Sequence, residues 1–425
     1  TTLAAAEDQL ELLDLSRAFD PVEPGSDRRS AYVRITRGCN KFCTYCVVPN
    51  TRGAEIHRPP DAIVEECKRL VDAGVIEITL LGQTVNHYRY THGAAVGSDG
   101  REQPQVGPGL AAFRQPIPAG QRTTTFARLL ERIHDEVPDL KRLRFVTSYP
   151  RDFGDDILGV MAACPRICRY IHAPAQSGSD RILKAMNRGY TRGEYLEFIA
   201  RVTERLPDCT IAGDIIVGFP TETDAEFEET VSLVRAVPFK NNFIFKYSPR
   251  PGTVAIDRFE DDVPTEVKKL RNNLLLDVQT EVSAKAHAAW VGRTVEVLVE
   301  QVRGGEETAE NAAKTALSLP LAASARGGAM HTHAHDHDHG HTPERDDASQ
   351  VEHPASRNVE VRWSRRRASS TARPSGVQVT GRTSGDLIVA IPIEGPTDPM
   401  GLVGSIVKVE IVSSGALLLQ GRMAP

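Results

Sequence analysis

The sequence predicts an α/β protein: a partial (β/α)6 barrel followed by a small all-β barrel that carries a long disordered insertion. Two changes of pattern along the chain support this fold class. From residue 31, short apolar segments alternate with amphipathic helical segments, which is typical of a parallel sheet covered by helices. From about Trp290 the segments become short and rich in β-branched residues, which indicates an all-β domain.

Six strands are predicted in the first part, at 31–36, 76–82, 143–148, 170–176, 211–219 and 242–248. The helices between them have recognisable ends. Thr191 with Glu194, and Thr223 with Glu226, have the spacing of a capping box at a helix start, and Gly74 is typical of a helix end. In barrels of this kind the active site lies in the loops that follow the carboxyl ends of the strands.

Two segments interrupt the alternation. Residues 1–30 carry seven acidic side chains against three arginines, and they predict a linker or the remnant of a missing N-terminal domain. Residues 90–123 are rich in Gly, Pro, Gln and Ala, so we expect a flexible insertion without function rather than a lid. The remaining chain divides into a first barrel at 31–288 and a second domain at 289–425.

The second domain is predicted to contain strands at 294–300, 377–383, 386–391 and 406–412, with 417–421 as a fifth. After the first of these, residues 302–376 contain few large apolar side chains. Such a stretch cannot bury enough apolar surface to fold, so it is predicted to be disordered.

This insertion holds two unusual runs. Residues 331–341 (HTHAHDHDHGH) place six histidines at every second position, a density that can bind transition metals. Within a disordered insertion, the tract is expected to bind metal opportunistically or not at all in the cell. Five arginines at 362–373 are predicted either to contact RNA phosphates or to form a solvated charge run.

The composition is that of an ordinary globular protein, with 425 residues, 40% hydrophobic and 25% charged. No apolar run approaches a membrane span, and the first residues show no secretory signal. Seven cysteines, an odd number, argue against a disulfide framework and for a reducing compartment. The net charge of −5 does not exclude a nucleic-acid partner, because binding needs only a local basic patch.

The most informative feature is the run GCNKFCTYC, in which Cys39, Cys43 and Cys46 are spaced C-x3-C-x2-C. A 4Fe–4S cluster normally takes four thiolates, so three in one loop leave one iron without a protein ligand. Metal sites that carry out chemistry keep such an open position. A zinc knuckle or three unrelated thiols is the alternative, although zinc motifs usually pair C-x2-C with a second, distant pair.

The other four cysteines are expected to be structural. Cys67 lies on the apolar stripe of a helix, and Cys209 opens a strand. Pro165 argues against a continuous helix that would pair Cys164 with Cys168 as metal ligands.

Several motifs resemble those of the MiaB-like radical S-adenosylmethionine (SAM) methylthiotransferases. They are CVVPNTRG at 46–53, ITLLGQTVN at 78–86, AQSGSD at 175–180, MNRGY at 186–190, DIIVGFPTE at 214–222 and YSPRPGT at 247–253. The C-terminal strands resemble the TRAM domain, the small RNA-binding barrel of that family. The resemblance covers nearly all of residues 30–300 and 377–422.

The resemblance implies a radical SAM barrel with one 4Fe–4S cluster and SAM as cofactors. A SAM-derived radical would allow a methylthio group to be placed on carbon two of an isopentenylated adenosine next to the tRNA anticodon. Anticodon-loop bases are unstacked and can enter a pocket, which suits this chemistry. The implied partners are the tRNA anticodon loop and an electron donor such as flavodoxin or ferredoxin, with no membrane and a cytoplasmic location.

The resemblance also assigns roles to individual residues. Tyr45 would lie near the SAM adenine, and Gln83 and Asn86 near its methionyl part. Hydroxyl and amide groups suited to ribose are placed at Ser148, Gln176, Ser177 and Ser179, with Gly178 allowing close approach of the backbone. The strand-end arginines Arg52, Arg188 and Arg250 would meet a carboxylate or phosphate, or else lie solvated on the surface.

One departure from the family matters for function. Its members carry an N-terminal domain whose three further cysteines hold a second 4Fe–4S cluster, thought to deliver sulfur, and residues 1–30 contain no cysteine. The first residue is Thr, as in a fragment or a processed form, and the acidic residues 1–30 resemble the family's interdomain linker, which favours a fragment. Two alternatives therefore stay open. One is a tRNA-binding iron–sulfur protein without full turnover. The other is a methylthiotransferase for threonylcarbamoyl-adenosine in tRNA or for a ribosomal protein.

Overall fold

The computed structural model describes residues 29–304, 376–393 and 398–424. Six parallel strands form two three-stranded sheets in the order of the sequence. They are β1 (Ser30–Arg34), β4 (Glu77–Leu81) and β8 (Arg142–Phe145), then β9 (Tyr170–His172), β10 (Thr210–Val217) and β11 (Phe239–Lys246). A bridge between Leu143 and Ile167 brings the two sheets together at β8 and β9. The α/β fold class is therefore confirmed.

All six strands end before their predicted last residue, and two of them end three or four residues early. The third ends at Phe145 and the fourth at His172. Just beyond them, Thr147 and Gln176 have φ angles of +66° and +72°. A left-handed residue cannot continue a strand, so both segments turn into loops at the carboxyl edge of the sheets.

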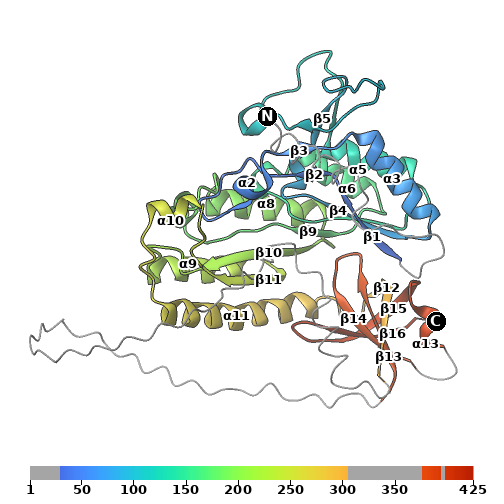
Figure 1. The fold of residues 1–425 in the computed structure, drawn as a ribbon. Helices are drawn as coiled ribbons and strands as arrows, with labels where there is room; N and C mark the ends of the chain where they lie inside the picture. Colours follow the sequence, from blue (N-terminus) through green and yellow to red (C-terminus); the bar gives the residue numbers. More distant parts are fainter. Residues whose placement is uncertain (1–28, 305–375, 394–397, 425) are drawn as a thin grey trace, which may run out of the picture. The chain divides into compact units, whose positions relative to one another are not determined.

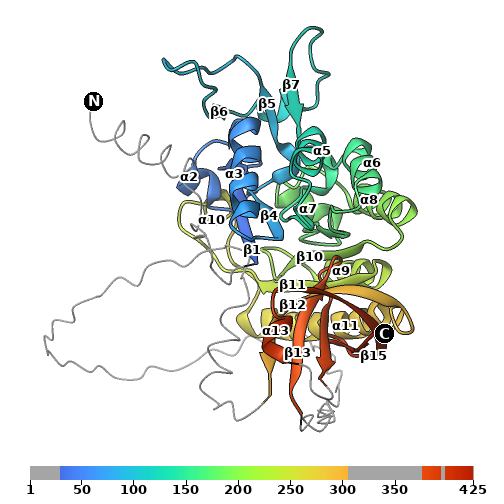
Figure 2. The ribbon, with the colours of Figure 1, turned by 90° about the vertical axis from the view of Figure 1, so that its right-hand side faces the viewer.

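Six longer helices cover these strands: α3 (Pro60–Asp72), α5 (Phe126–Glu136), α6 (Asp155–Ala163), α8 (Arg192–Arg205), α9 (Asp224–Ala236) and α11 (Thr265–Ala288). Both capping boxes are confirmed, because the side chains of Thr191 and Thr223 each accept a hydrogen bond from the backbone of the glutamate three residues on. The longest helix, α11, packs along β11 and α9 and reaches β15 (Figures 1 and 2).

The insertion at 90–123 differs from the expected flexible segment. Its edges pair as β5 (Arg89–Thr91) with β7 (Thr123–Thr125), and β6 (Gln105–Val106) extends β3 (Ile56–His57). A short helix, α4 (Gly109–Phe113), follows β6. Strands of two or three residues show no periodicity in sequence, so only their pairing partners, distant along the chain, reveal them.

The C-terminal strands form a closed barrel in the order β12-β13-β14-β16-β15. Its members are β12 (Thr294–Arg303), β13 (Gln378–Thr383), β14 (Ile388–Pro392), β15 (Ile406–Ser414) and β16 (Leu419–Met423). All five predicted strands are confirmed. The predicted disordered insertion, with its histidine tract at 331–341 and its arginines at 362–373, lies almost wholly outside the described residues.

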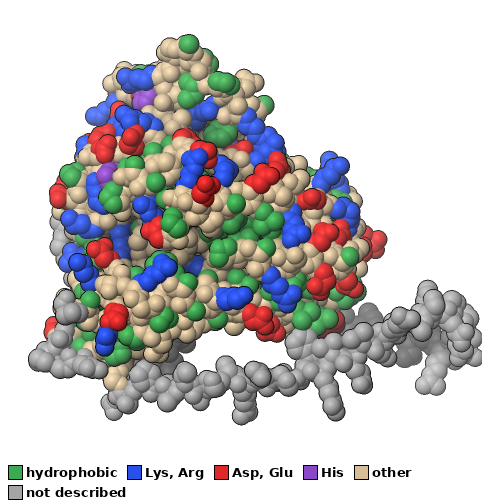
Figure 3. Space-filling model, turned by 180° about the vertical axis from the view of Figure 1, so that it is seen from behind, with side chains coloured by type: hydrophobic (Ala, Val, Ile, Leu, Met, Phe, Trp, Pro, Cys, Tyr) green, Lys and Arg blue, Asp and Glu red, His purple; other side chains and the backbone are tan. Residues whose placement is uncertain are grey.

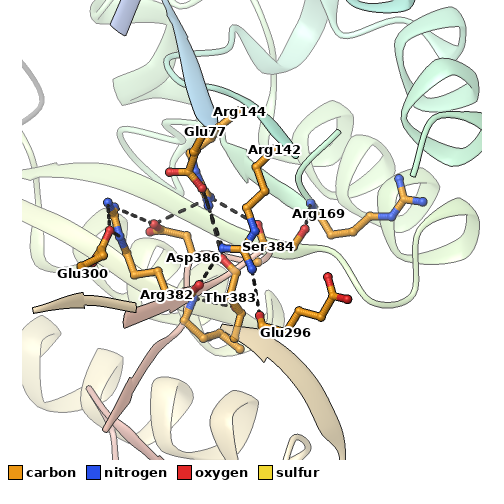
Figure 4. A network of polar contacts seen from close by, with 12 residues as sticks. Glu77, Arg142, Arg144, Arg169, Glu296, Glu300, Arg382, Thr383, Ser384 and Asp386 are labelled. Carbon is orange, nitrogen blue, oxygen red and sulfur yellow. Dashed lines mark hydrogen bonds and ion pairs between the residues drawn. The ribbon is translucent and has the colours of Figure 1, made fainter. Parts of the chain in front are cut away.

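A network of buried charges joins this barrel to the amino ends of the first-part strands (Figure 4). Arg144 on β8 is buried, and its Nη2 donates to Glu77 Oε2 and to the Thr383 carbonyl, both at 3.3 Å. Arg142 donates to the carbonyls of Arg382 (2.7 Å) and Glu296 (2.9 Å). The guanidinium groups thus satisfy carbonyls of the barrel that would otherwise be buried without partners.

Asp386, in the turn between β13 and β14, is the acidic centre of the barrel's side of this network. It pairs with Lys240 and, at 3.1 Å, with Arg382. Burial alone would raise the pKa of Asp386, but the cationic Lys240, Arg144 and Arg382 hold it at about 2. The carboxylate is therefore charged at neutral pH, and the turn is fastened at the amino edge of the sheets. The opposite, carboxyl edge of the same sheets is not covered by the barrel and is where the candidate active site lies.

Candidate active site

The three cysteines lie in a loop that begins after β2 (Thr36–Arg37). Within the loop, the Cys46 amide donates to the Cys43 carbonyl at 3.0 Å, and the Cys39 amide donates to the Gly53 carbonyl at 3.3 Å. Gly38 opens the loop at a φ of +73°, and a Cβ there would lie 2.0 Å from the Ala54 carbonyl oxygen. Only glycine fits this position, so the loop closes tightly on itself.

A second segment, MNRGY at 186–190, holds the cysteine loop from the other side. The Thr44 amide donates to the Met186 carbonyl at 3.0 Å, and Asn187 donates to the Phe42 carbonyl at 2.9 Å. Arg188 is buried, and its Nη1 lies 3.3 Å from Cys43 Sγ and 3.4 Å from the Tyr45 hydroxyl. Arg188 is therefore not a solvated surface arginine, and its charge faces the position of a thiolate. Arg52 and Arg250 are exposed.

A cavity of about 150 Å³ opens beside the loop. It is lined by all three cysteines and by four further residues predicted for the site: Tyr45, Gln83, Ser148 and Gln176. Thr84, Thr147, Tyr149 and Asp214 also line it and were not predicted. These residues follow β4, β8 and β9 or lie on β10, so the carboxyl edge of the sheets gathers them.

Two polar atoms of this cavity are buried without a hydrogen-bond partner in the described structure: Ser148 Oγ and Gln176 Oε1. Buried polar groups are normally paired, and an unpaired one in a cavity marks a place for a ligand. Since three thiols line the same cavity, it offers metal ligands together with a hydroxyl and an amide. This donor set fits a cluster and a polar small molecule bound side by side.

Three predicted contact residues lie elsewhere. The Asn86 side chain is buried and is engaged in hydrogen bonds with both the amide and the carbonyl of Tyr149. Ser177 pairs with Thr230, and Ser179 donates to Glu226 on α9. Their polar groups are used within the fold, and none of the three lines the cavity.

Gly178 has a related structural role. A Cβ at Gly178 would lie 2.4 Å from the Glu229 carbonyl oxygen, and its amide donates to Thr230 Oγ1 at 2.9 Å. The close backbone approach predicted for this glycine therefore serves the packing of α9 against the AQSGSD segment.

The thiols are shielded from solvent, and this affects their protonation. Burial raises the pKa of Cys39 to about 11 and raises the pKa of Cys46 as well. Both remain thiols at neutral pH until a metal displaces the proton, because metal ligation requires thiolates. Among the described residues, no three His, Cys, Asp or Glu side chains converge on one metal ion. The three thiols instead share the wall of a cavity.

The remaining cysteines are buried or half-buried at separate places. Cys67 lies in the core face of α3, and Cys209 precedes β10. Cys164 ends α6 and Cys168 follows it outside any helix, so the two do not share a helix face.

A buried polar cluster behind the cysteine loop escaped the sequence analysis. Lys41 Nζ donates to Asp152 Oδ2 at 2.6 Å, and His87 Nε2 lies 2.8 Å from the same oxygen. Phe113 of the insertion stacks on His87 with ring centroids 4.1 Å apart, and Arg114 donates to Asp152 at 3.2 Å. The insertion thus packs on the groups that hold the cysteine loop. Contacts between such distant segments leave no local pattern in sequence.

Burial shifts the protonation of this region towards neutral side chains. It lowers the pKa of His87 to about 4 and raises the pKa of Glu55, 3.8 Å from His87, to about 7. His57 is fully buried, and neither of its ring nitrogens is hydrogen-bonded to any residue that the structure describes. Burial, and then the nearby His87, lower the pKa of His57 to about 3.

We expect His57 to make the fold sensitive to acid. The unfolded chain takes up a proton at His57 near pH 6.5, whereas the folded chain does not until about pH 3. Its contribution is therefore complete above pH 6.5 and is lost as the pH falls from 6.5 towards 3. When the pH falls from 7.5 to 5.5, the unfolding free energy of the wild-type chain should decrease by about 1.4 kcal/mol more than that of the His57→Leu variant. Urea unfolding at both pH values measures this; equal losses would contradict it.

A larger pocket, of about 320 Å³, lies apart from the cysteines, at the start of α9. Its charged lining groups are engaged within the fold: Arg271 donates to Glu222 at 2.8 Å and to Asp224 at 2.7 Å, and Asp262 accepts from the Thr221 amide. These pairs hold α11 against α9, so we assign the pocket a structural role.

Comparison with known families matches this arrangement. Residues 33–234 match the radical SAM superfamily. This segment contains the cysteine loop and the cavity residues from Tyr45 to Asp214. Residues 33–234 are therefore similar to the radical SAM superfamily. Radical SAM domains bind a 4Fe–4S cluster and SAM, and the three thiols and the unpaired polar atoms of the cavity fit this pair.

Two similar proteins are both described as tRNA-2-methylthio-N(6)-dimethylallyladenosine synthase. The protein from Rhodopirellula baltica is 46% identical over 285 residues, which is 66% of this chain and 54% of that protein. The protein from Thermus thermophilus is 46% identical over 276 residues, covering 65% of this chain and 53% of that protein. The chain thus spans about half the length of the curated relatives it matches.

Among solved structures, the radical SAM enzyme coproporphyrinogen III oxidase from Escherichia coli is 15% identical, with a TM-score of 0.39. The match covers 66% of this chain and 57% of that one. Within the part of the chain that the structure describes, no helix has the length and apolarity needed to cross a membrane.

Proposed function

We propose that this chain is the radical SAM part of a tRNA methylthiotransferase that acts on N6-dimethylallyladenosine next to the anticodon. The observation that carries the proposal is the cavity lined by three thiols and by two unpaired polar atoms. It is supported by 46% identity over 285 residues to an enzyme named for this product. When bound, a 4Fe–4S cluster and SAM would supply the radical chemistry for this reaction. The protein's own part is to hold both cofactors and to orient the base.

The roles follow from position. Cys39, Cys43 and Cys46 would hold three irons, and Arg188, 3.3 Å from Cys43 Sγ, would stabilise the charge of that thiolate. Tyr45, Gln83, Ser148 and Gln176 would contact SAM, because they line the same cavity as the thiols. Asn86, Ser177 and Ser179 support this wall through their bonds to neighbouring segments.

The five-stranded barrel at the C-terminus is proposed to be a TRAM domain that contacts RNA, with a domain boundary near residue 289. Lys and Arg side chains are interspersed with Asp and Glu over much of the face in Figure 3. On that face, RNA recognition is therefore expected to rest on local groups rather than on one broad basic surface. A flavodoxin or ferredoxin as electron donor and a cytoplasmic location belong to the same proposal.

Sulfur insertion is expected to need more than this chain. Of its seven cysteines, three form the loop, and the other four lie at separate places in or next to the core. A second three-cysteine loop is therefore absent from the sequence. A second cluster, expected for this family, would have to be held by residues outside these 425.

We therefore expect partial chemistry from the chain alone. After anaerobic reconstitution and with a strong reductant, it should cleave SAM to 5′-deoxyadenosine but give no methylthiolated tRNA. Chromatography with mass spectrometry measures both products, and N6-dimethylallyl-modified tRNA serves as substrate. The variant Cys46→Ala is the control for cleavage without the radical cluster.

Each outcome separates the alternatives. Cleavage that is stimulated by modified tRNA supports the proposal. If SAM cleavage is stimulated instead by threonylcarbamoyl-adenosine tRNA or by a ribosomal protein, the substrate belongs to that class. If SAM is not cleaved although the cluster is intact, the chain is an RNA-binding iron–sulfur protein without turnover.

A further inference from the structure

The inner face of β11 carries two exposed aromatic side chains that the site described so far does not use. Phe243 is 44% exposed and Phe245 is 50% exposed. The neighbouring side chains on β11 face the other way. The Asn242 side chain donates a hydrogen bond to Gln279 of α11, and Ile244 packs against the core next to that helix. Because side chains alternate along a strand, Phe243 and Phe245 face away from α11, towards the inside of the curved sheets.

The strand register places polar groups beside these rings. Phe243 is the partner of Asp214 on β10, and Phe245 is the partner of Ile216. His172 on β9 is the partner of Ala212, two residues before Asp214, so its side chain lies on the same face. His172 Nε2 is 3.2 Å from Asp214 Oδ1, and its ring meets Phe243 edge-on at 6.3 Å. The three side chains form one row across three strands.

This row continues into the cofactor cavity. Asp214 lines the cavity with the three cysteines, whereas Phe243 and Phe245 lie one strand further on. The Asp214 carboxylate, which His172 orients, therefore lies one strand away from the exposed apolar surface of the two phenylalanines. Neighbouring strands are about 5 Å apart. Large exposed apolar groups on an inner face mark a binding surface, and aromatic rings suit flat bases.

The chemistry of the row fits one particular atom. An adenine whose exocyclic N6 carries an alkyl group keeps one N–H donor and has one apolar substituent on the same nitrogen. An acceptor and an apolar surface on neighbouring strands match these two groups. An unsubstituted adenine would leave the apolar surface uncovered, and a purely polar site would not recognise the alkyl group.

We propose that His172, Asp214, Phe243 and Phe245 form the recognition site for the N6-alkyl group of the substrate adenosine. Asp214 accepts the remaining N6–H, His172 orients the carboxylate, and the two phenylalanines cover the five-carbon branched chain. This assignment rests on the proposed function and names the groups that select a prenylated base over an unmodified one. Phe243 and Phe245 are specificity residues and take no part in the chemical step.

Binding of two RNAs tests the proposal. Two 17-nucleotide anticodon stem-loops, one with adenosine and one with N6-dimethylallyladenosine at the target position, are titrated against the reconstituted chain by fluorescence anisotropy. We expect the wild-type chain to bind the prenylated RNA about ten-fold more tightly, equivalent to about 1.4 kcal/mol. Phe243→Ala and Phe245→Ala should each reduce this ratio, and the double variant should bring it to about one.

Leu276→Ala is the matched control, because Leu276 is an equally exposed apolar side chain (43%) on α11. It should leave the ratio unchanged. Circular dichroism shows whether each variant is folded, and Phe243→Leu, which keeps an apolar side chain, should retain part of the ratio. Equal affinity of the wild-type chain for the two RNAs would overturn the assignment, as would an unchanged ratio in the folded double variant. Failure to bind either RNA would refute the proposed function, and the assignment with it.

Discussion

Replacing Cys43 with alanine should abolish the iron–sulfur cluster. The wild-type chain is expected to take up about four irons after anaerobic reconstitution, since one cube binds three loop cysteines. Cys43 is the most buried thiol of the three and receives the Arg188 hydrogen bond at 3.3 Å. Without it, two thiolates and an uncompensated buried guanidinium remain in the loop. Iron content should fall close to zero, together with the visible absorbance of the cluster.

The controls for this experiment come from the same chain. Cys209→Ala removes a half-buried thiol that precedes β10 and should leave the iron content at about four. Arg188→Lys keeps the positive charge and should retain more iron than Arg188→Ala. Iron that persists in the single Ala variants of all three loop cysteines would disprove the assignment of the cluster to this loop.

Removing Arg144 should cause the largest loss of stability among the changes considered. Its guanidinium pairs with Glu77 and donates to the carbonyls of Thr383 and Ser384, all within 3.3 Å. The variant Arg144→Ala would leave the Glu77 carboxylate, 3% exposed, without its closest partner. Breaking a buried ion pair in this way typically costs about 3–5 kcal/mol. Urea unfolding of the wild-type and variant chains measures the difference.

Two further variants show whether the loss has this cause. Arg422→Ala breaks an ion pair with Glu410 whose arginine is 71% exposed, and it should cost less than about 1 kcal/mol. Adding Glu77→Gln to Arg144→Ala removes the unpaired charge and should recover part of the stability. If the exposed and buried arginine variants lose the same free energy, the network does not fasten the barrel.

The two edges of the first-part sheets have different roles: the amino edge binds the C-terminal barrel, and the carboxyl edge forms the cavity. Charged groups at the amino ends of β4 and β8 are used to bind the C-terminal barrel. Loops at the carboxyl ends of the same strands supply Gln83 and Ser148 to the cavity. A substitution in the network is therefore expected to act on stability first, whereas one in the cavity loops acts on cofactor binding.

The sequence by itself determined the order and type of the elements. Alternating apolar segments, capping boxes and β-branched runs are local signals, because they reflect contacts within a few residues or one face of one element. The cysteine spacing is local too, so Cys39, Cys43 and Cys46 could be assigned to one loop before any fold was known. Tyr45 was assigned through the family resemblance of the same loop, and Ser148 through its place at the end of a predicted strand.

The tertiary structure decided which of the remaining residues face the cavity. Asn86, Ser177 and Ser179 have the right chemistry, but their hydrogen bonds are used by partners 47 to 63 residues away in sequence. Pairing at such separations depends on how strands and helices pack and leaves no trace in local composition. The position of Asp214 beside Phe243 depends likewise on the register of two strands, which is set by packing against α11 on the opposite face.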